Sequence, residues 1–170
     1  MSNGFAGKIV ACFTLVALLV FSGLGSALAS AQYTSTQSFV DYLESEKIIY
    51  NYKGILSLTE EEQVTVTYTL DNLSPQTCSL YFHPDGDSVS LRIWSIVTVT
   101  AGENYIFSTL QTLNQKYKYA KFVYDESDST VEVDMDMYID PYRCGEVVCD
   151  NMQVLFTIVD DAASMLQSLE

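Results

Sequence analysis

Ser-His-acid or Cys-His catalysis in this chain would have to involve its one histidine, because both mechanisms need an imidazole base. That residue, His83, stands directly before Pro84 in a turn-forming stretch, which favours an exposed turn histidine over a general base. The 8 glycines are scattered and form no phosphate-binding loop. The residues therefore predict a non-enzymatic protein. A hydrolase that uses paired carboxylates is the alternative, because an acidic chain offers many such pairs.

Two acidic turns are the best candidates for a ligand site of another kind. Asp85-Gly86-Asp87 and Asp125-Glu126-Ser127-Asp128 cluster carboxylates, the oxygen ligands that calcium prefers. Neither has the spacing of an EF-hand loop, and the terminal bidentate glutamate is missing. Solvated hairpin turns explain both clusters, so we expect no metal and no cofactor. A small-ligand or calcium-binding protein of the cell envelope is kept as an alternative.

The cysteines give a third possible chemistry. Cys12 falls in the apolar N-terminal stretch, which leaves Cys78, Cys144 and Cys149. Cys78 alternates in phase with Leu80 and Phe82, as a small core residue does. Cys144 and Cys149 are close in the chain, so we predict a disulfide between them. Three cysteines and one histidine have no recognisable zinc spacing.

The N-terminal residues 1–31 have the layout of a secretory signal peptide. Lys8 precedes an apolar run from Ile9 to Leu24, and small residues ending in Ala27, Ala29 and Ala31 follow. The A-x-A pattern predicts cleavage after Ala29 or after Ala31. The alternative is an uncleaved anchor formed by residues 9–31, since about 20 apolar residues span a bilayer. Either way the remainder is expected to be extracytoplasmic, in the periplasm or secreted.

The charge of the remainder limits its partners. The chain has 22 acidic and 8 basic residues, and removing Lys8 leaves seven basic ones and a formal charge of −15. Nucleic-acid binding depends on Lys and Arg neutralising phosphates, so nucleic acid is excluded as a partner. Membrane contact is expected only if the N-terminal segment stays uncleaved.

Hydrophobic periodicity predicts one domain over residues 33–170, with elements in the order α-β-β-β-α-β-β-α. This order is typical of an α+β domain, an antiparallel sheet with helices packed on one face. The expected helices cover 38–47, 103–117 (opened by a capping box at Thr100-Ala101-Gly102-Glu103) and 146–169, and the expected strands cover 63–70, 78–82, 89–98, 121–124 and 130–139.

Two segments of this pattern resemble the YbjN family, which is labelled as regulators of sensory transduction. They are the helix, turn and long alternating strand from Leu110 to Ile139, and the middle hairpin LYFHPDGDSVSLRIWSIVTV. The resemblance implies a fold like that of type III secretion chaperones, which are dimers that bind extended partner segments. Those chaperones act in the cytoplasm, so the leader of this chain departs from their pattern.

The expected binding surface lies on the sheet face that the helices leave open. Alternation in the strand 89–98 places Arg92, Trp94 and Ile96 opposite Val89, Leu91 and Ile93. An exposed Trp beside Ile is a candidate interface. We therefore expect a protein or peptide partner, bound by a monomer or by a homodimer. The alternative is that a helix or the segment 48–56 covers this face, since a shift of one residue in register would exchange the two faces.

Overall fold

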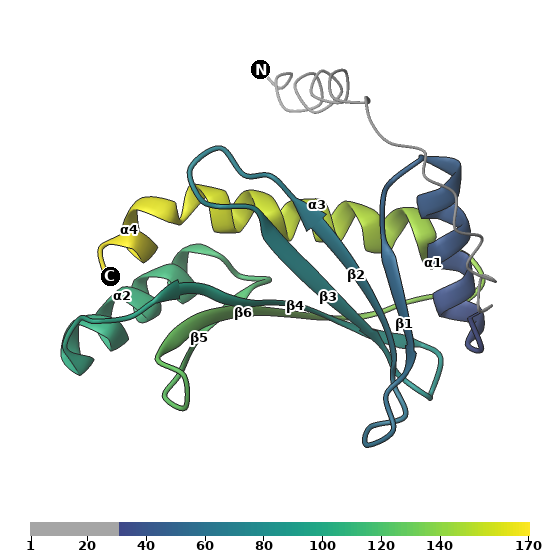
Figure 1. The fold of residues 1–170 in the computed structure, drawn as a ribbon, viewed down its shortest axis with the longest axis horizontal. Helices are drawn as coiled ribbons and strands as arrows, with labels where there is room; N and C mark the ends of the chain where they lie inside the picture. The colour runs from purple at the N-terminus through teal and green to yellow at the C-terminus, as the bar shows by residue number, and fades with distance from the viewer. Residues whose placement is uncertain (1–30) are drawn as a thin grey trace, which may run out of the picture.

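The computed structural model describes residues 31–170, so the predicted signal peptide lies outside the described residues. An α+β fold is confirmed within this range. Four helices and six strands follow one another in the order shown in Figure 1. They are α1 (Thr34–Ser45), β1 (Asn51–Ile55), β2 (Glu62–Tyr68), β3 (Gln76–Phe82), β4 (Ser88–Thr98), α2 (Glu103–Lys116), β5 (Lys121–Asp125), β6 (Thr130–Tyr138), α3 (Cys144–Asp161) and α4 (Ala163–Gln167).

All six strands form one sheet in the order β1-β2-β3-β4-β6-β5, and every neighbouring pair is antiparallel. The register places Val64 opposite Leu80, and Leu80 opposite Leu91. Because side chains alternate along a strand, these apolar residues share one face of the sheet. Helix α3 runs along this face with α1 packed beside it, and none of the helices within residues 31–170 lies on the other face (Figure 1). We call the latter the open face.

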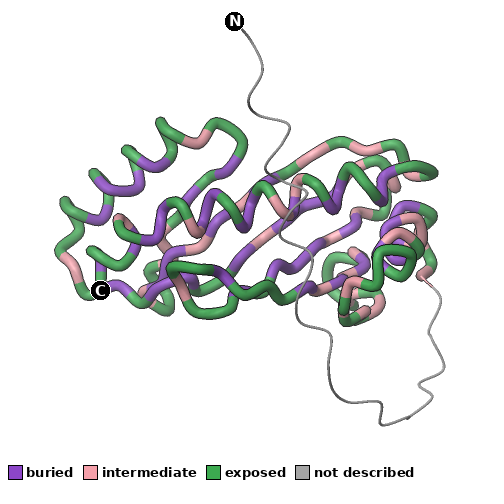
Figure 2. Tube along the Cα trace, turned by 90° about the horizontal axis from the view of Figure 1, so that it is seen from above, coloured by how far each residue is buried: buried purple, intermediate pink, exposed green. Residues whose placement is uncertain are grey.

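The core lies between this apolar face and the helices. Leu43 of α1, Leu155 and Val159 of α3, and Leu80 and Leu91 of the sheet are fully buried. Figure 2 shows buried residues alternating with exposed ones along the strands and recurring along the sides of the helices. The heptad-like spacing of α3 is therefore the spacing of a helix that buries one side on a sheet.

Three predicted features of the element order were wrong. A further edge strand, β1, precedes β2, and the last helix ends at Asp161, with the short α4 after it. The capping box is absent, because Gly102 is the N-cap of α2 and no side chain caps it. The Thr100 hydroxyl instead donates to the carbonyl of Glu170, and the amides of Thr100 and Ala101 donate to Leu169. These hydrogen bonds hold the C-terminal residues Leu169 and Glu170 against the turn between β4 and α2.

An irregularity in β4 changes which side chains reach the open face. Ile93 pairs with Val133 and Val97 pairs with Val131, so β4 holds two more residues than β6 between these pairs. Ser95, inside this bulge, has a φ of 51°. A bulge bends its strand and redirects side chains. Here Trp94 stays outward, whereas Ile96 and Val97 both face the core.

None of the helices within residues 31–170 combines the length and the apolar character that crossing a membrane requires.

Candidate functional site

The open face of the sheet carries a cluster of Arg92, Trp94 and Asp134, which we call the Trp94 cluster. The guanidinium of Arg92 lies 5.6 Å from the centre of the Trp94 ring, within the range of a cation–π contact. Its Nη1 atom is 3.0 Å from Oδ2 of Asp134 on the adjacent strand. Register explains this pair, because Arg92 and Asp134 are direct neighbours across β4 and β6. Trp94 remains 43% exposed, so the cluster presents an aromatic ring to solvent.

Two of the three predicted binding residues therefore come together, and the third does not. Arg92 and Trp94 share the open face, as the alternation predicted. The prediction for Ile96 was wrong, because this residue is 5% exposed and belongs to the core. The two extra residues in β4 cause the difference, since they break strict alternation between Ile93 and Val97.

The electrostatics of the Trp94 cluster leave one hydrogen-bonding position open. Oδ2 of Asp134 accepts from Arg92, but Oδ1 is buried without a hydrogen-bond partner among the described residues. Desolvation raises the pKa of the Asp134 carboxyl, and Arg92 opposes that rise. Desolvation and the charge of Asp134 also raise the pKa of Glu132. A donor brought by a binding partner would satisfy Asp134 and stabilise its charged form.

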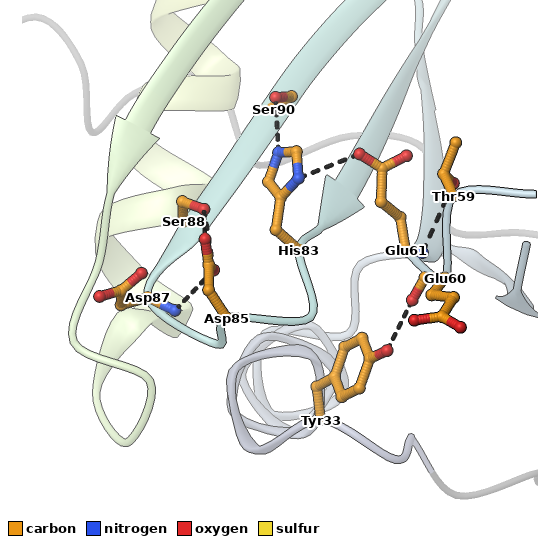
Figure 3. A network of polar contacts seen from close by, with 9 residues as sticks. All are labelled: Tyr33, Thr59, Glu60, Glu61, His83, Asp85, Asp87, Ser88 and Ser90. Carbon is orange, nitrogen blue, oxygen red and sulfur yellow. Dashed lines mark hydrogen bonds and ion pairs between the residues drawn. The ribbon is translucent and has the colours of Figure 1, made fainter.

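A second group of polar residues lies at one end of the sheet, around His83 (Figure 3). Nε2 of His83 is 2.9 Å from Oγ of Ser90, and Nδ1 is 3.0 Å from Oε1 of Glu61. We call these three residues the His83 triad. His83 directly follows β3, Ser90 is the third residue of β4, and Glu61 directly precedes β2. The prediction of a freely exposed turn histidine was wrong, because His83 links three neighbouring strands.

The order and distances of the His83 triad match a nucleophile, a base and an acid that orients the base. An acyl-transfer site also needs donors for the developing oxyanion, usually backbone N–H groups. Ser90 lies within a central strand, paired with Tyr81 on one side and Asp136 on the other, so the strand backbone there is engaged in the sheet. Ser90 is also buried, with an exposed fraction of 7%. The geometry of the His83 triad therefore allows proton transfer from Ser90 to His83, but it does not provide backbone donors for an oxyanion.

A surface hollow of about 340 Å³ joins the two groups. His83, Ser90 and Arg92 all line it, together with Asp136 and Tyr138 of β6. A ligand seated in this hollow would contact His83 and Ser90 of the triad and Arg92 of the Trp94 cluster. The open face therefore has a hollow lined by polar side chains at one end and the aromatic ring of Trp94 in its middle.

The sequence contained a signal for the His83 triad that periodicity alone does not use. In the β2–β3 pairing, Glu62 lies opposite Phe82, so continuing the register places Glu61 opposite His83. Aligning Val64 with Leu80 in an antiparallel hairpin gives the same pairing of Glu61 with His83. The hydrophobic pattern gives that alignment only once the two strands are known to be neighbours.

The predicted disulfide between Cys144 and Cys149 was wrong, because both cysteines are free and buried. They lie five residues apart on α3, and at about 1.5 Å of rise per residue their backbones are about 7.5 Å apart along the helix axis. This separation exceeds what a disulfide bridges without moving the backbone. Cys78 is also free and fully buried, as its phase with Leu80 predicted.

The two acidic turns use their carboxylates locally. Asp85 Oδ1 accepts from the Asp87 amide at 3.2 Å and the Ser88 hydroxyl at 3.0 Å. Asp125 Oδ1 accepts from the Ser127 amide at 2.8 Å, and hydrogen bonding from the Ser127 side chain and amide lowers the pKa of Asp125. Within residues 31–170, no group of three or more His, Cys, Asp and Glu side chains is arranged to hold a metal ion. The turns are thus organised by their own aspartates.

No protein-family model, curated protein or solved structure matches this chain. The resemblance to the YbjN family, and with it the fold label of a type III secretion chaperone, stays a prediction.

Proposed function

We propose that this chain is an exported, non-enzymatic domain that binds a protein segment on its open sheet face, at the Trp94 cluster. The observation that carries the proposal is the combination of a 43% exposed Trp94 with a buried Asp134 oxygen that has no donor. Exposed aromatic residues dominate binding energy where they become covered. The empty acceptor position gives the partner a specific hydrogen bond in addition to apolar contact.

Charge indicates what the partner brings. Glu132, Asp134 and Asp136 follow one another along the open side of β6, while Arg92 is already paired with Asp134. A second copy of this chain would bring another surface of the same sign, since the part after the leader has a formal charge of −15. A segment that carries lysine or arginine next to an apolar side chain fits better. We therefore favour a basic protein segment over a homodimer.

The test uses the fact that Trp94 is the only tryptophan in the chain, so its fluorescence reports on this surface alone. The exported protein, the Trp94→Asp variant and the Phe107→Asp variant are each used to capture partners from a cell-envelope extract. Phe107 is the matched control, because it is an aromatic residue that is 54% exposed on α2. A captured protein is then purified and titrated against the domain while the Trp94 emission is followed.

The proposal predicts one partner that the wild type and Phe107→Asp retain and that Trp94→Asp loses. Its binding should shift the Trp94 emission and weaken as salt rises, because salt screens exposed charges over about 10 Å at 0.1 M. Equal capture by all three proteins, or no specific capture, would overturn the proposed site. Concentration-dependent dimers in sedimentation that Trp94→Asp dissociates would replace the basic segment with a second copy.

A serine hydrolase is the second candidate, and only the His83 triad favours it. In that mechanism the Ser90 hydroxyl attacks a carbonyl, His83 takes its proton, and Glu61 orients the imidazole. Arg92 lines the same hollow, although its guanidinium is already paired with Asp134. A fluorophosphonate probe distinguishes the candidates. Labelling that disappears in Ser90→Ala would establish the hydrolase, and an unlabelled folded protein would remove it.

A further inference from the structure

The side chain of Glu62 is the most deeply buried charge in the described part of the chain, with 0% exposure. Its carboxylate accepts three hydrogen bonds. The backbone amide of Gln32 donates to Oε1 at 2.6 Å, the amide of Tyr33 donates to Oε2 at 2.8 Å, and the Tyr52 hydroxyl donates to Oε1 at 2.5 Å. Neither of the two ion pairs among residues 31–170 includes Glu62. A buried carboxylate thus has donors but no opposite charge, which is costly.

The first of these donors stands at one of the two predicted cleavage positions. The A-x-A pattern allows cleavage after Ala29 or after Ala31, and cleavage after Ala31 makes Gln32 the first residue. We infer that the mature protein begins at Gln32 and that its α-ammonium forms a partly buried ion pair with Glu62. The inference rests on the expected leader and is independent of the binding proposal.

The chemical step is hydrolysis of the Ala31–Gln32 peptide bond by a leader peptidase. One water is consumed, Ala31 leaves with a carboxylate, and the nitrogen of Gln32 becomes an amine. An α-amine has an ordinary pKa of about 7.7 to 8.0, so it carries a proton at neutral pH. The nitrogen already lies 2.6 Å from Oε1 of Glu62, so the ion pair forms without a change in position.

The surroundings favour this pairing over a free ammonium at the same place. Gln32 immediately precedes Tyr33, the N-cap of α1, and the N-terminus of a helix repels a positive charge. Glu62 offsets that repulsion. Tyr33, Tyr52 and Glu60 also lie at the site, and the carbonyl of Glu60 accepts from the Tyr33 hydroxyl at 2.6 Å. None of these three groups is a cation, whereas an α-ammonium at Gln32 would be one.

Cleavage after Ala29 would lose this arrangement. The chain would then begin at Ser30, its ammonium would be two residues away from the carboxylate, and Gln32 would keep a neutral amide. Glu62 would stay uncompensated. The structure therefore selects between two sites that the sequence pattern leaves equal.

The first experiment expresses the full chain in an exporting host and determines the N-terminal sequence and intact mass of the product. We expect a chain that starts at Gln32. A start at Ser30 or a retained leader would overturn the inference. So would a mass lower by one ammonia, because it would show that Gln32 had cyclised and had no free amine.

The second experiment measures the ion pair itself through the rate of acetylation of the α-amine at neutral pH, followed by peptide mapping. Pairing with Glu62 should slow acetylation of Gln32 by about tenfold or more, since each unit of pKa changes the free-amine fraction tenfold. Glu62→Gln should restore the rate, and lysines in the same sample serve as the internal control. If Glu62→Gln does not fold, Glu62→Asp takes its place, because it keeps the negative charge on a shorter side chain. An α-amine acetylated equally fast in wild type and variant would refute the pair.

Discussion

Gly145 of α3 lies so close to Tyr42 of α1 that a Cβ atom at position 145 would be 2.5 Å from the Tyr42 Cβ. It would also be 2.7 Å from the carbonyl oxygen of Ser38. Backbone and Cβ atoms cannot move aside as the end of a flexible side chain can. The absence of a side chain at Gly145 therefore sets how closely the two helices pack over the sheet.

We expect Gly145→Ala to destabilise the domain. Overpacking costs about 1–3 kcal/mol, and the better helix propensity of alanine returns up to about 1 kcal/mol of that. Urea unfolding should therefore show a lower free energy of unfolding. Gly102→Ala is the matched control, because nothing lies within 4 Å of its Cβ position. Equal losses in both variants would contradict the close-packing explanation.

Asn114 at the end of α2 holds the start of β5. Its Nδ2 donates to the Phe122 carbonyl at 3.0 Å, and its Oδ1 accepts from the Phe122 amide at 2.7 Å. Asn114→Ala leaves two partly buried backbone groups unpaired, and we expect a loss of about 1–3 kcal/mol in unfolding free energy. Asn151→Ala removes only an exposed contact within α3. It should change stability by less than about 0.5 kcal/mol, and a comparable loss there would argue against the role of Asn114.

The three cysteines of the described chain should be unreactive until it unfolds. Burial raises the pKa of Cys78 to about 12 and that of Cys149 to about 11, so both are protonated at pH 8, and only the thiolate attacks a thiol reagent. We expect no rapid reaction of native protein with Ellman's reagent and three reactive thiols per domain in denaturant without reductant. A single reactive thiol in denaturant would instead show that Cys144 and Cys149 form the disulfide that the sequence predicted.

Two tyrosines predict a loss of stability at alkaline pH. Desolvation and a hydrogen bond to Glu44 raise the pKa of Tyr50 to about 12, and desolvation with a bond to Glu62 raises that of Tyr52 as well. A raised folded pKa contributes stability that is complete below the unfolded value of about 10. That contribution is lost as pH rises through the folded value.

We therefore expect the urea midpoint to fall above about pH 10, with part of the phenolate absorbance appearing only as the domain unfolds. The Tyr50→Phe variant should show a smaller alkaline loss than the wild type. Tyr138→Phe, at a residue that is 88% exposed, is the control and should follow the wild type. A wild-type midpoint that stays constant up to the folded pKa of Tyr50 would contradict the prediction.

Periodicity was sufficient where a strand buries one face completely. Val64 and Val66 of β2 and Val131 and Val133 of β6 lie inward as alternation predicted. It missed β1, whose residues are all exposed or half-exposed and which also contains a glycine at a φ of 82°. An edge strand of this kind is held mainly by its backbone pairing with β2. Because backbone pairing does not depend on which side chains are apolar, the hydrophobic pattern does not reveal it.

Contacts between distant residues were predictable only in part. The Arg92–Asp134 pair needs β4 beside β6, although β5 is closer in the chain. The contact between Gln32 and Glu62 needs the position of α1 relative to β2, which no periodicity encodes. A pattern reports which face of an element is buried, whereas these contacts depend on which elements become neighbours.

The two additional residues of β4 also determine which changes of length the strand tolerates. An even excess leaves the alternation in step on both sides of the bulge, so Val97 and Val99 return to the core after Trp94 has turned outward. Inserting or deleting one residue here would reverse Val97, Thr98 and Val99, whereas adding or removing a pair would not. A change of two residues in the stretch around Trp94 would therefore alter the exposed surface while the same side chains remain in the interior.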